Sequence, residues 1–222
     1  MKIKIHFNKK TPMIAVGIAF IVFAIILVAL AQTAQPREIL AEWKPETRPR
    51  DMSSHNPNTG TDANTAARLT RSNAAVVPGG AGGTRKDDPR FSYYTRGWNA
   101  EGQYWQISGV STQGYERIEL SFATRGSNTG PKNFALEYST DGTTWRPLRD
   151  GKNVWIAYTI AENNRFQRHG PYELSSAINN LEILHFRFAN TDEESVIGDT
   201  TKSSGTNYIA DITLSGIAMS DK

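Results

Sequence analysis

The chain has 222 residues, of which 38% are hydrophobic and 10% aromatic, a length that suits one domain of about 150 to 180 residues plus a targeting segment. The absence of cysteine excludes disulfide frameworks, thiolate metal sites and cysteine nucleophiles. The net charge of +3 does not indicate a nucleic-acid partner, because residues 1–12 contribute +4, whereas residues 91–222 carry twelve basic and fifteen acidic residues.

The N-terminal segment predicts a membrane span. Residues 13–31 contain no polar side chain, and an α-helix of that length spans roughly 28 Å, close to the hydrocarbon thickness of a bilayer. Residues 1–12 form a basic tail with Lys2, Lys4, Lys9 and Lys10, which we expect to stay in the cytoplasm. The sequence therefore predicts one N-terminal transmembrane (signal-anchor) helix with the rest of the chain outside the cell.

A cleaved signal peptide is the alternative interpretation of the same segment. Ala29-Leu30-Ala31 fits the small-x-small pattern that precedes a cleavage point, and Gln32 follows it. The apolar run is longer than the ~7 to 15 residues of an ordinary signal peptide, which favours the uncleaved anchor in the cell membrane. Cleavage after Ala31 would make the protein secreted, and both interpretations export the remainder.

The exported part divides into two regions by composition. Residues 48–90 contain four prolines, the run Gly79-Gly80-Ala81-Gly82-Gly83 and few large apolar side chains, which is typical of a solvated stalk. From Phe91 onward, segments rich in aromatic and β-branched residues alternate with Gly, Asn, Asp and Pro. That spacing is typical of an all-β sandwich.

Alternation of apolar and polar residues predicts the individual strands. Trp105 and Ile107, for example, face away from Tyr104 and Gln106. The Asp141-Gly142 dipeptide between two alternating segments predicts a tight hairpin, and Ala210-Asp211 marks a bulge in the last strand. The predicted strands lie within residues 104–108, 118–122, 134–139, 154–160, 184–188 and 208–217.

Several of these strings resemble a known kind of module. They are the segments 104–107, 111–115, 118–122, 125–131 and 134–142, with the closing segment 205–216. Together they resemble a bacterial extracellular galactose-binding-like (discoidin-type) jelly-roll β-sandwich. The resemblance implies a non-catalytic ligand-binding or adhesion unit, which opens with a short strand ending in Trp. Residues 38–43 are similar to that opening, so we expect the domain to cover residues 37–218, with 48–90 as a long irregular segment inside it.

Catalytic constellations are scarce in the sequence. The four histidines are far apart, no metal-ligand spacing occurs, and no serine stands in a Gly-x-Ser-x-Gly turn. Glu119 and Glu137 stand at outward strand positions, where solvated carboxylates are usual. We therefore expect no enzyme activity, and a small secreted hydrolase is the least favoured alternative.

Aromatic residues supply the candidate ligand-binding set. Sugar-binding sandwiches place a Trp or Tyr face against the apolar side of a pyranose, with Arg and Asn beside it. Trp98 lies in a Gly-Trp-Asn loop and Trp155 on the less apolar face of its strand, whereas Trp105 and Trp145 are assigned to the core. The polar candidates in neighbouring loops are Arg125, Asn128, Asn163, Asn164 and Arg165.

An acidic loop supplies the candidate metal ligands. Asp192, Glu193, Glu194 and Asp199 offer the carboxylate oxygens that Ca²⁺ prefers. The resemblance implies a structural calcium ion at such a loop, and a plain solvated loop is the alternative.

The resulting hypothesis is a membrane-anchored or exported binding module on the cell surface. Its expected partner is carbohydrate or another surface or matrix component. A protein-binding structural or assembly component of the cell envelope is the alternative. An aromatic pair in a groove would favour the first function, and a broad apolar patch or an open sheet edge would favour the second.

Overall fold

The computed structural model describes residues 35–46, 54–72, 77–81, 89, 91–161 and 165–220. The chain divides into two compact units at Pro36, and only the second unit, Arg37–Lys222, is described in any detail. The predicted transmembrane helix at 13–31 lies outside the described residues. In the described part of the chain, no helix is long and apolar enough to cross a membrane.

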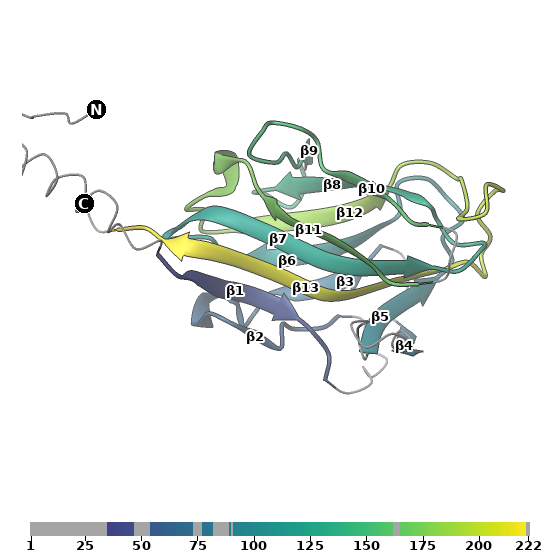
Figure 1. Cartoon of the computed structure of the whole chain (residues 1–222), viewed down its shortest axis with the longest axis horizontal. Helices are drawn as coiled ribbons and strands as arrows, with labels where there is room; N and C mark the ends of the chain where they lie inside the picture. Colours follow the sequence, from purple (N-terminus) through teal and green to yellow (C-terminus); the bar gives the residue numbers. More distant parts are fainter. Residues whose placement is uncertain are drawn as a thin grey trace, which may run out of the picture. The chain divides into compact units, whose positions relative to one another are not determined.

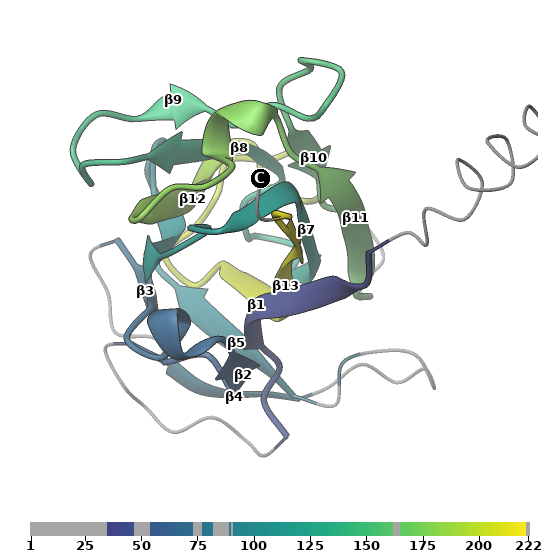
Figure 2. The same ribbon diagram turned by 90° about the vertical axis from the view of Figure 1, so that its left-hand side faces the viewer.

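The second unit is an all-β sandwich of two antiparallel sheets (Figures 1 and 2). The first sheet has seven strands, and its main path runs β11-β7-β13-β1-β2, with β5 on β13 and β4 on β5. These strands are β1 (Arg37–Trp43), β2 (Thr59–Gly60), β4 (Val77–Ala81), β5 (Phe91–Arg96), β7 (Tyr115–Gly126), β11 (Gln167–Glu173) and β13 (Thr206–Ala218).

The second sheet has six strands in the order β10-β8-β12-β6-β3, and β9 pairs with β8. These strands are β3 (Arg68–Arg71), β6 (Tyr104–Val110), β8 (Asn133–Ser139), β9 (Arg146–Pro147), β10 (Ala157–Thr159) and β12 (Leu184–Asn190). Two short 3-10 helices, η1 (Asp62–Asn64) and η2 (Ser176–Ile178), complete the described elements. Figure 1 shows β7, β13 and β1 side by side in one layer.

The predicted alternation is confirmed in the central strands. Trp105 and Ile107 of β6, like Phe186 and Phe188 of β12, are buried, whereas the residues between them are half-exposed. The opening strand at residues 38–43 is β1, which pairs antiparallel with β13. The register of β13 against β7 shifts between Ala210 and Thr213, where the bulge was predicted.

Residues 48–90, predicted to be irregular, contain three short strands and one 3-10 turn in their described parts. Asn64 of η1 fixes this segment to the sandwich and is almost fully buried. Its side-chain amide donates to the carbonyl oxygens of Leu40 and Ser111, and its side-chain oxygen accepts from the backbone N–H of Ser111. The segment is thus ordered by contacts to distant strands, which its own composition does not reveal.

Two strands differ from what the sequence indicates. One contains a dipeptide that is unusual in strands, and the other is shorter than predicted. β11 includes Gly170-Pro171, a pair that usually marks a turn. The structure accommodates the proline because β11 is an edge strand, whose partner strand among the described residues is β7, and its register shifts between His169 and Tyr172. Residues 154–160 form a strand only at 157–159.

One hydrogen bond joins the two sheets through the core. The indole Nε1 of Trp105, from the six-stranded sheet, donates to Oδ1 of Asn207, from the seven-stranded sheet, at 2.7 Å. Both side chains are completely buried. Because neither group can turn to water, the bond specifies how the two inner faces meet.

We predict that Trp105→Phe destabilises the fold by about 1 to 3 kcal/mol beyond the loss of ring volume, because it leaves Oδ1 of Asn207 buried without a donor. Urea unfolding of Trp105→Phe, Asn207→Ala and the double variant measures the coupling energy between the two side chains. Strictly additive losses would contradict the prediction.

His169 lies at the side of the core where β11 meets β7. Its ring stacks on Phe122 with centroids 4.9 Å apart and lies 4.4 Å from the ring of Tyr158, and Nε2 is 2.8 Å from the hydroxyl of Thr124. Burial lowers the pKa of His169 to about 4. The folded state therefore holds the imidazole neutral, while the unfolded chain takes up a proton at ordinary pH values for histidine.

We predict that His169 makes the fold less stable as the pH falls from about 6.5 to 4, because only the unfolded state is protonated in that window, with a loss of at most about 3 kcal/mol. Thermal unfolding of wild type and His169→Gln between pH 7.5 and 4 tests this. The variant should lose less stability than wild type over the same interval. Identical slopes would show that another group is responsible.

Candidate functional site

The candidate site lies on the outward face of the six-stranded sheet, around Arg187. Because Phe186 and Phe188 point into the core, Arg187 between them points outward. Its neighbours across the strands are Gln106 of β6 and Glu137 of β8. A cation, an amide and a carboxylate thus stand side by side on three adjacent strands.

Two aromatic rings hold the guanidinium of Arg187. Its central carbon lies 3.8 Å from the ring centroid of Tyr104 and 3.7 Å from that of Trp145, close enough for strong cation–π contact. Nε donates to Oε1 of Gln106 at 2.9 Å, and Nη2 donates to the hydroxyl of Tyr104 at 3.0 Å. Burial lowers the pKa of Arg187, and the tyrosine and Glu137 oppose that shift. The side chain is therefore fixed in one position, with donors left on its outer nitrogen.

Trp145 reaches this face from the loop 139–145 between β8 and β9. Asp141 shapes the loop, because its Oδ1 accepts from the backbone N–H groups of Thr143 and Thr144 at 2.8 and 2.7 Å. These bonds hold the pKa of Asp141 well below its usual range. Since Tyr138 pairs with Arg146, the predicted tight turn is in fact a seven-residue loop. The assignment of Trp145 to the core is wrong, because this loop places it on Arg187.

Trp155 lies beside the same row and was predicted as a ligand-binding residue. Its side chain is 44% exposed, and its Nε1 donates to the carbonyl oxygen of Leu136 at 2.8 Å. Leu136 immediately precedes Glu137, so the indole lies next to the Arg187 row. We call the set of Tyr104, Gln106, Glu137, Trp145, Trp155 and Arg187 the aromatic platform.

Small side chains flank the aromatic platform. Ala189 pairs with Tyr104 on one side and with Ala135 on the other, and Ala157 continues the row at the edge strand. Ala135 is only 3% exposed, so other side chains cover the middle of this row, whereas Ala157 at the edge is exposed. A ligand could therefore approach this face at the edge, beside Trp155, but not over Ala135.

Trp98, the other predicted aromatic ligand, is buried, and the prediction that it binds ligand is wrong. None of its surface is exposed. Its Nε1 donates to the carbonyl oxygen of Thr95, and its ring packs against Trp105, Phe134 and the guanidinium of Arg71. The loop folds over the end of the core, so the flanking Gly and Asn did not indicate exposure.

The predicted polar ligand residues do not join the aromatic platform. Arg125 lies on β7 of the other sheet, Asn128 is exposed in the loop after β7, and Arg165 is exposed just before β11. Asn163 and Asn164 lie outside the described residues. The residues missed by sequence reasoning are Tyr104, Gln106, Glu137, Trp145 and Arg187. For the four on strands, a shared outward phase was the available signal, but the strand order was not, and the direction of the loop that carries Trp145 had no signal in the sequence.

The acidic loop is held mainly by local contacts. Nζ of Lys132 lies 2.6 Å from Oε1 of Glu194, and the amide of Asn133 donates to the carboxylates of Asp192 and Glu194. Glu193 and Asp199 are exposed. In the part of the chain described, no three His, Asp or Glu side chains gather closely enough to hold a metal ion. Calcium binding by Asp192, Glu193, Glu194 and Asp199 stays a prediction.

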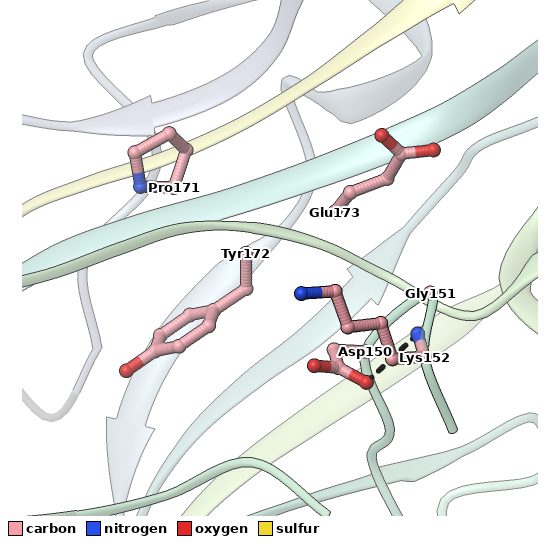
Figure 3. A pocket seen from close by; sticks show the side chains of 6 residues that line it. All are labelled: Asp150, Gly151, Lys152, Pro171, Tyr172 and Glu173. Atoms are coloured by element: carbon pink, nitrogen blue, oxygen red, sulfur yellow. Dashed lines mark hydrogen bonds between the residues drawn. The ribbon is translucent and has the colours of Figure 1, made fainter. Parts of the chain in front are cut away.

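A separate depression of about 400 Å³ lies between β11 and the loop before β10 (Figure 3). Figure 3 shows the ring of Tyr172 on one side and Asp150 and Lys152 on the other. Asp150 accepts from the backbone N–H groups of Lys152 and Val154, and Glu173 at the rim pairs with Arg117. Its carboxylates thus serve local structure, and it contains none of the aromatic platform. The remaining lining residues are Gly151 and Pro171.

No family model and no curated protein matches the chain. Among solved structures, it resembles the N-terminal cellulose-binding domain of β-1,4-glucanase C from Cellulomonas fimi, with 7% identity over 64% of this chain and 89% of that domain, at a TM-score of 0.36. It also resembles the xylan-binding domain CBM22-1 of Xyn10C from Paenibacillus barcinonensis, with 11% identity over 85% of this chain and 100% of the other, at a TM-score of 0.40.

A third likeness is to TmCBM61, solved in complex with β-1,4-galactotriose, with 12% identity over 68% of this chain and 88% of the other, at a TM-score of 0.36. The β-sandwich resemblance of residues 104–142 agrees with the two antiparallel sheets of the chain itself. Because each TM-score is below 0.5, the function of the chain has to be argued from its own residues.

Proposed function

We propose that the chain is a non-catalytic module that binds carbohydrate on the outward face of its six-stranded sheet. The observation that carries the proposal is the aromatic platform, in which Trp145 is fixed against Arg187 and the exposed Trp155 is bonded to Leu136, the residue before Glu137. The ligand is a glycan of the cell surface or matrix.

Each part of the aromatic platform has a role in this proposal. An indole packs against the apolar C–H face of a sugar ring and removes both from water, as large aromatic side chains do in binding sites. Arg187 and Glu137 offer a donor and an acceptor to hydroxyls, which fix the orientation of the ring. Because Arg187 is already held by Gln106 and Tyr104, little side-chain freedom remains to be lost on binding.

We further propose that residues 13–31 anchor the module in the cell membrane, with residues 1–12 in the cytoplasm and the sandwich outside. The apolar run and the four lysines before it support this. Cleavage after Ala31 would release the same module. The intact mass of the exported protein distinguishes the two forms.

We predict that Trp155→Ala and Trp145→Ala each raise the Kd for the bound glycan at least about tenfold, because central aromatic contacts dominate such interfaces. Calorimetric titration of the full chain, in an uncharged detergent without a sugar headgroup, with cello-, xylo- and galacto-oligosaccharides measures this. Ile183→Ala, which trims an equally exposed apolar side chain elsewhere, should change nothing.

One control and two further outcomes decide what a negative result means. Thermal unfolding must show that each variant keeps the wild-type fold. Saturable binding that neither tryptophan affects would place the site elsewhere. No binding of any neutral oligosaccharide would remove the support for a neutral-glycan module.

A protein-binding role in the envelope is the second candidate function. Val154, 59% exposed, adjoins Trp155, and such an exposed apolar pair also suits a protein contact. If glycans fail to bind, a Trp155-dependent complex with a purified envelope protein would favour this role. The aromatic platform contains one carboxylate, Glu137, so it does not supply the acidic pair that a hydrolase would need.

A further inference from the structure

A second aromatic row lies on the outward face of the seven-stranded sheet. Tyr94 of β5, Tyr208 of β13 and Arg125 of β7 are directly paired across three neighbouring strands. The rings of Tyr94 and Tyr208 stack with centroids 5.4 Å apart, and Arg125 lies 4.1 Å from the centroid of Tyr208. Phe166 completes the row, 5.0 Å from Arg125. We call Tyr94, Tyr208, Arg125 and Phe166 the tyrosine row.

Arg125 differs from Arg187 in what surrounds its nitrogens. Within the described residues it makes no hydrogen bond, and its Nε is buried without a partner. Among the described residues, it contacts the ring faces of Phe166 and Tyr208, which supply no strong acceptor for N–H groups. A guanidinium held in place by rings, with its donors uncommitted, is suited to an anion that arrives from outside.

The surroundings of the tyrosine row are positively charged. Arg96 follows Tyr94 by two residues on β5, so it shares the outward face, and its side chain is exposed. The nearest acid along β13 is Asp211, which already pairs with Arg168 at 3.2 Å. Among the described residues of the row and of β5, no acidic side chain balances Arg125 and Arg96. This end of the face therefore complements a negative ligand.

The tyrosine row favours a carboxylated sugar over a nucleic acid. Binding to a phosphate backbone depends on many Lys and Arg residues, whereas residues 91–222 carry a net charge of −3. A guanidinium fork matches a planar carboxylate in a bidentate pair. The hydroxyls of Tyr94 and Tyr208 make no hydrogen bond in the described part of the chain and can serve sugar hydroxyls.

We propose that the tyrosine row is a second binding site, which takes an acidic polysaccharide through a uronate carboxylate on Arg125. It lies on the opposite sheet from the aromatic platform, so the two sites are separate. The module could then hold a neutral glycan on one face and an acidic glycan on the other at the same time.

The test is calorimetric titration of the full chain, in the same detergent, with trigalacturonate at 50 and 300 mM NaCl. We expect saturable binding that weakens at the higher salt concentration. Arg125→Gln should weaken it at least tenfold, and Tyr208→Phe, which removes one hydroxyl, a few-fold. Trp155→Ala should leave it unchanged, and galactotriose should not compete.

Arg37→Gln is the matched control, because it removes one positive charge from the same sheet at the opposite end of β13, where Arg37 pairs with Ile217. An equal loss in Arg37→Gln and Arg125→Gln would mean non-specific attraction and would overturn the proposal. So would loss of trigalacturonate binding in Trp155→Ala, or Arg125-dependent binding to phosphatidylglycerol vesicles without any to trigalacturonate. Since neutral sugars are titrated separately, failure at the aromatic platform would not be mistaken for failure at the tyrosine row.

Discussion

In β6 and β12, successive side chains alternate between the core and the surface, so the residues that fill the core also determine which residues face outward. Trp105 and Phe186 must face inward because their large apolar side chains fill the space between the sheets. Their neighbours in sequence, Tyr104 and Arg187, are thereby directed outward and across adjacent strands. A slip of one residue in either strand would exchange the two faces and destroy core and aromatic platform together.

The bond between Trp105 and Asn207 adds a second constraint of the same kind. It allows one alignment of β6 in one sheet with β13 in the other, because both polar atoms lie where water cannot replace a lost partner. β13 also positions Tyr208, the residue after Asn207, on the opposite outward face. One buried contact thus helps to set the orientation of residues on both exposed faces.

The central strands could be predicted from the sequence, and the candidate site only in part. Alternation sufficed for β6 and β12, because each buries one face against a continuous core, whereas in β8 Ala135 and Ser139 are buried although their phase places them outward. It failed for the segment around Asn64, whose order comes from hydrogen bonds to Leu40 on β1 and to Ser111 just after β6. The exposure of the tryptophans, likewise, could be predicted where strand alternation applied and could not be predicted in loops. Trp155 was predicted from its place in an alternating strand, whereas Trp98 and Trp145 lie in loops whose direction depends on the whole fold.

The two arginines show why a similar contact can serve different ends. Both lie on aromatic rings, yet Arg187 donates to Gln106 and Tyr104, while Arg125 donates to no residue in the described part of the chain. Hydrogen bonds to Gln106 and Tyr104 fix Arg187 in one position, so that it supports Trp145 and keeps only part of its N–H groups for the proposed ligand. Arg125 is oriented by its rings alone, and its donors remain available for a charged group. The number of acceptors around each guanidinium, more than its aromatic neighbours, is therefore what separates the proposed neutral-sugar surface from the proposed acidic-sugar surface in this sandwich.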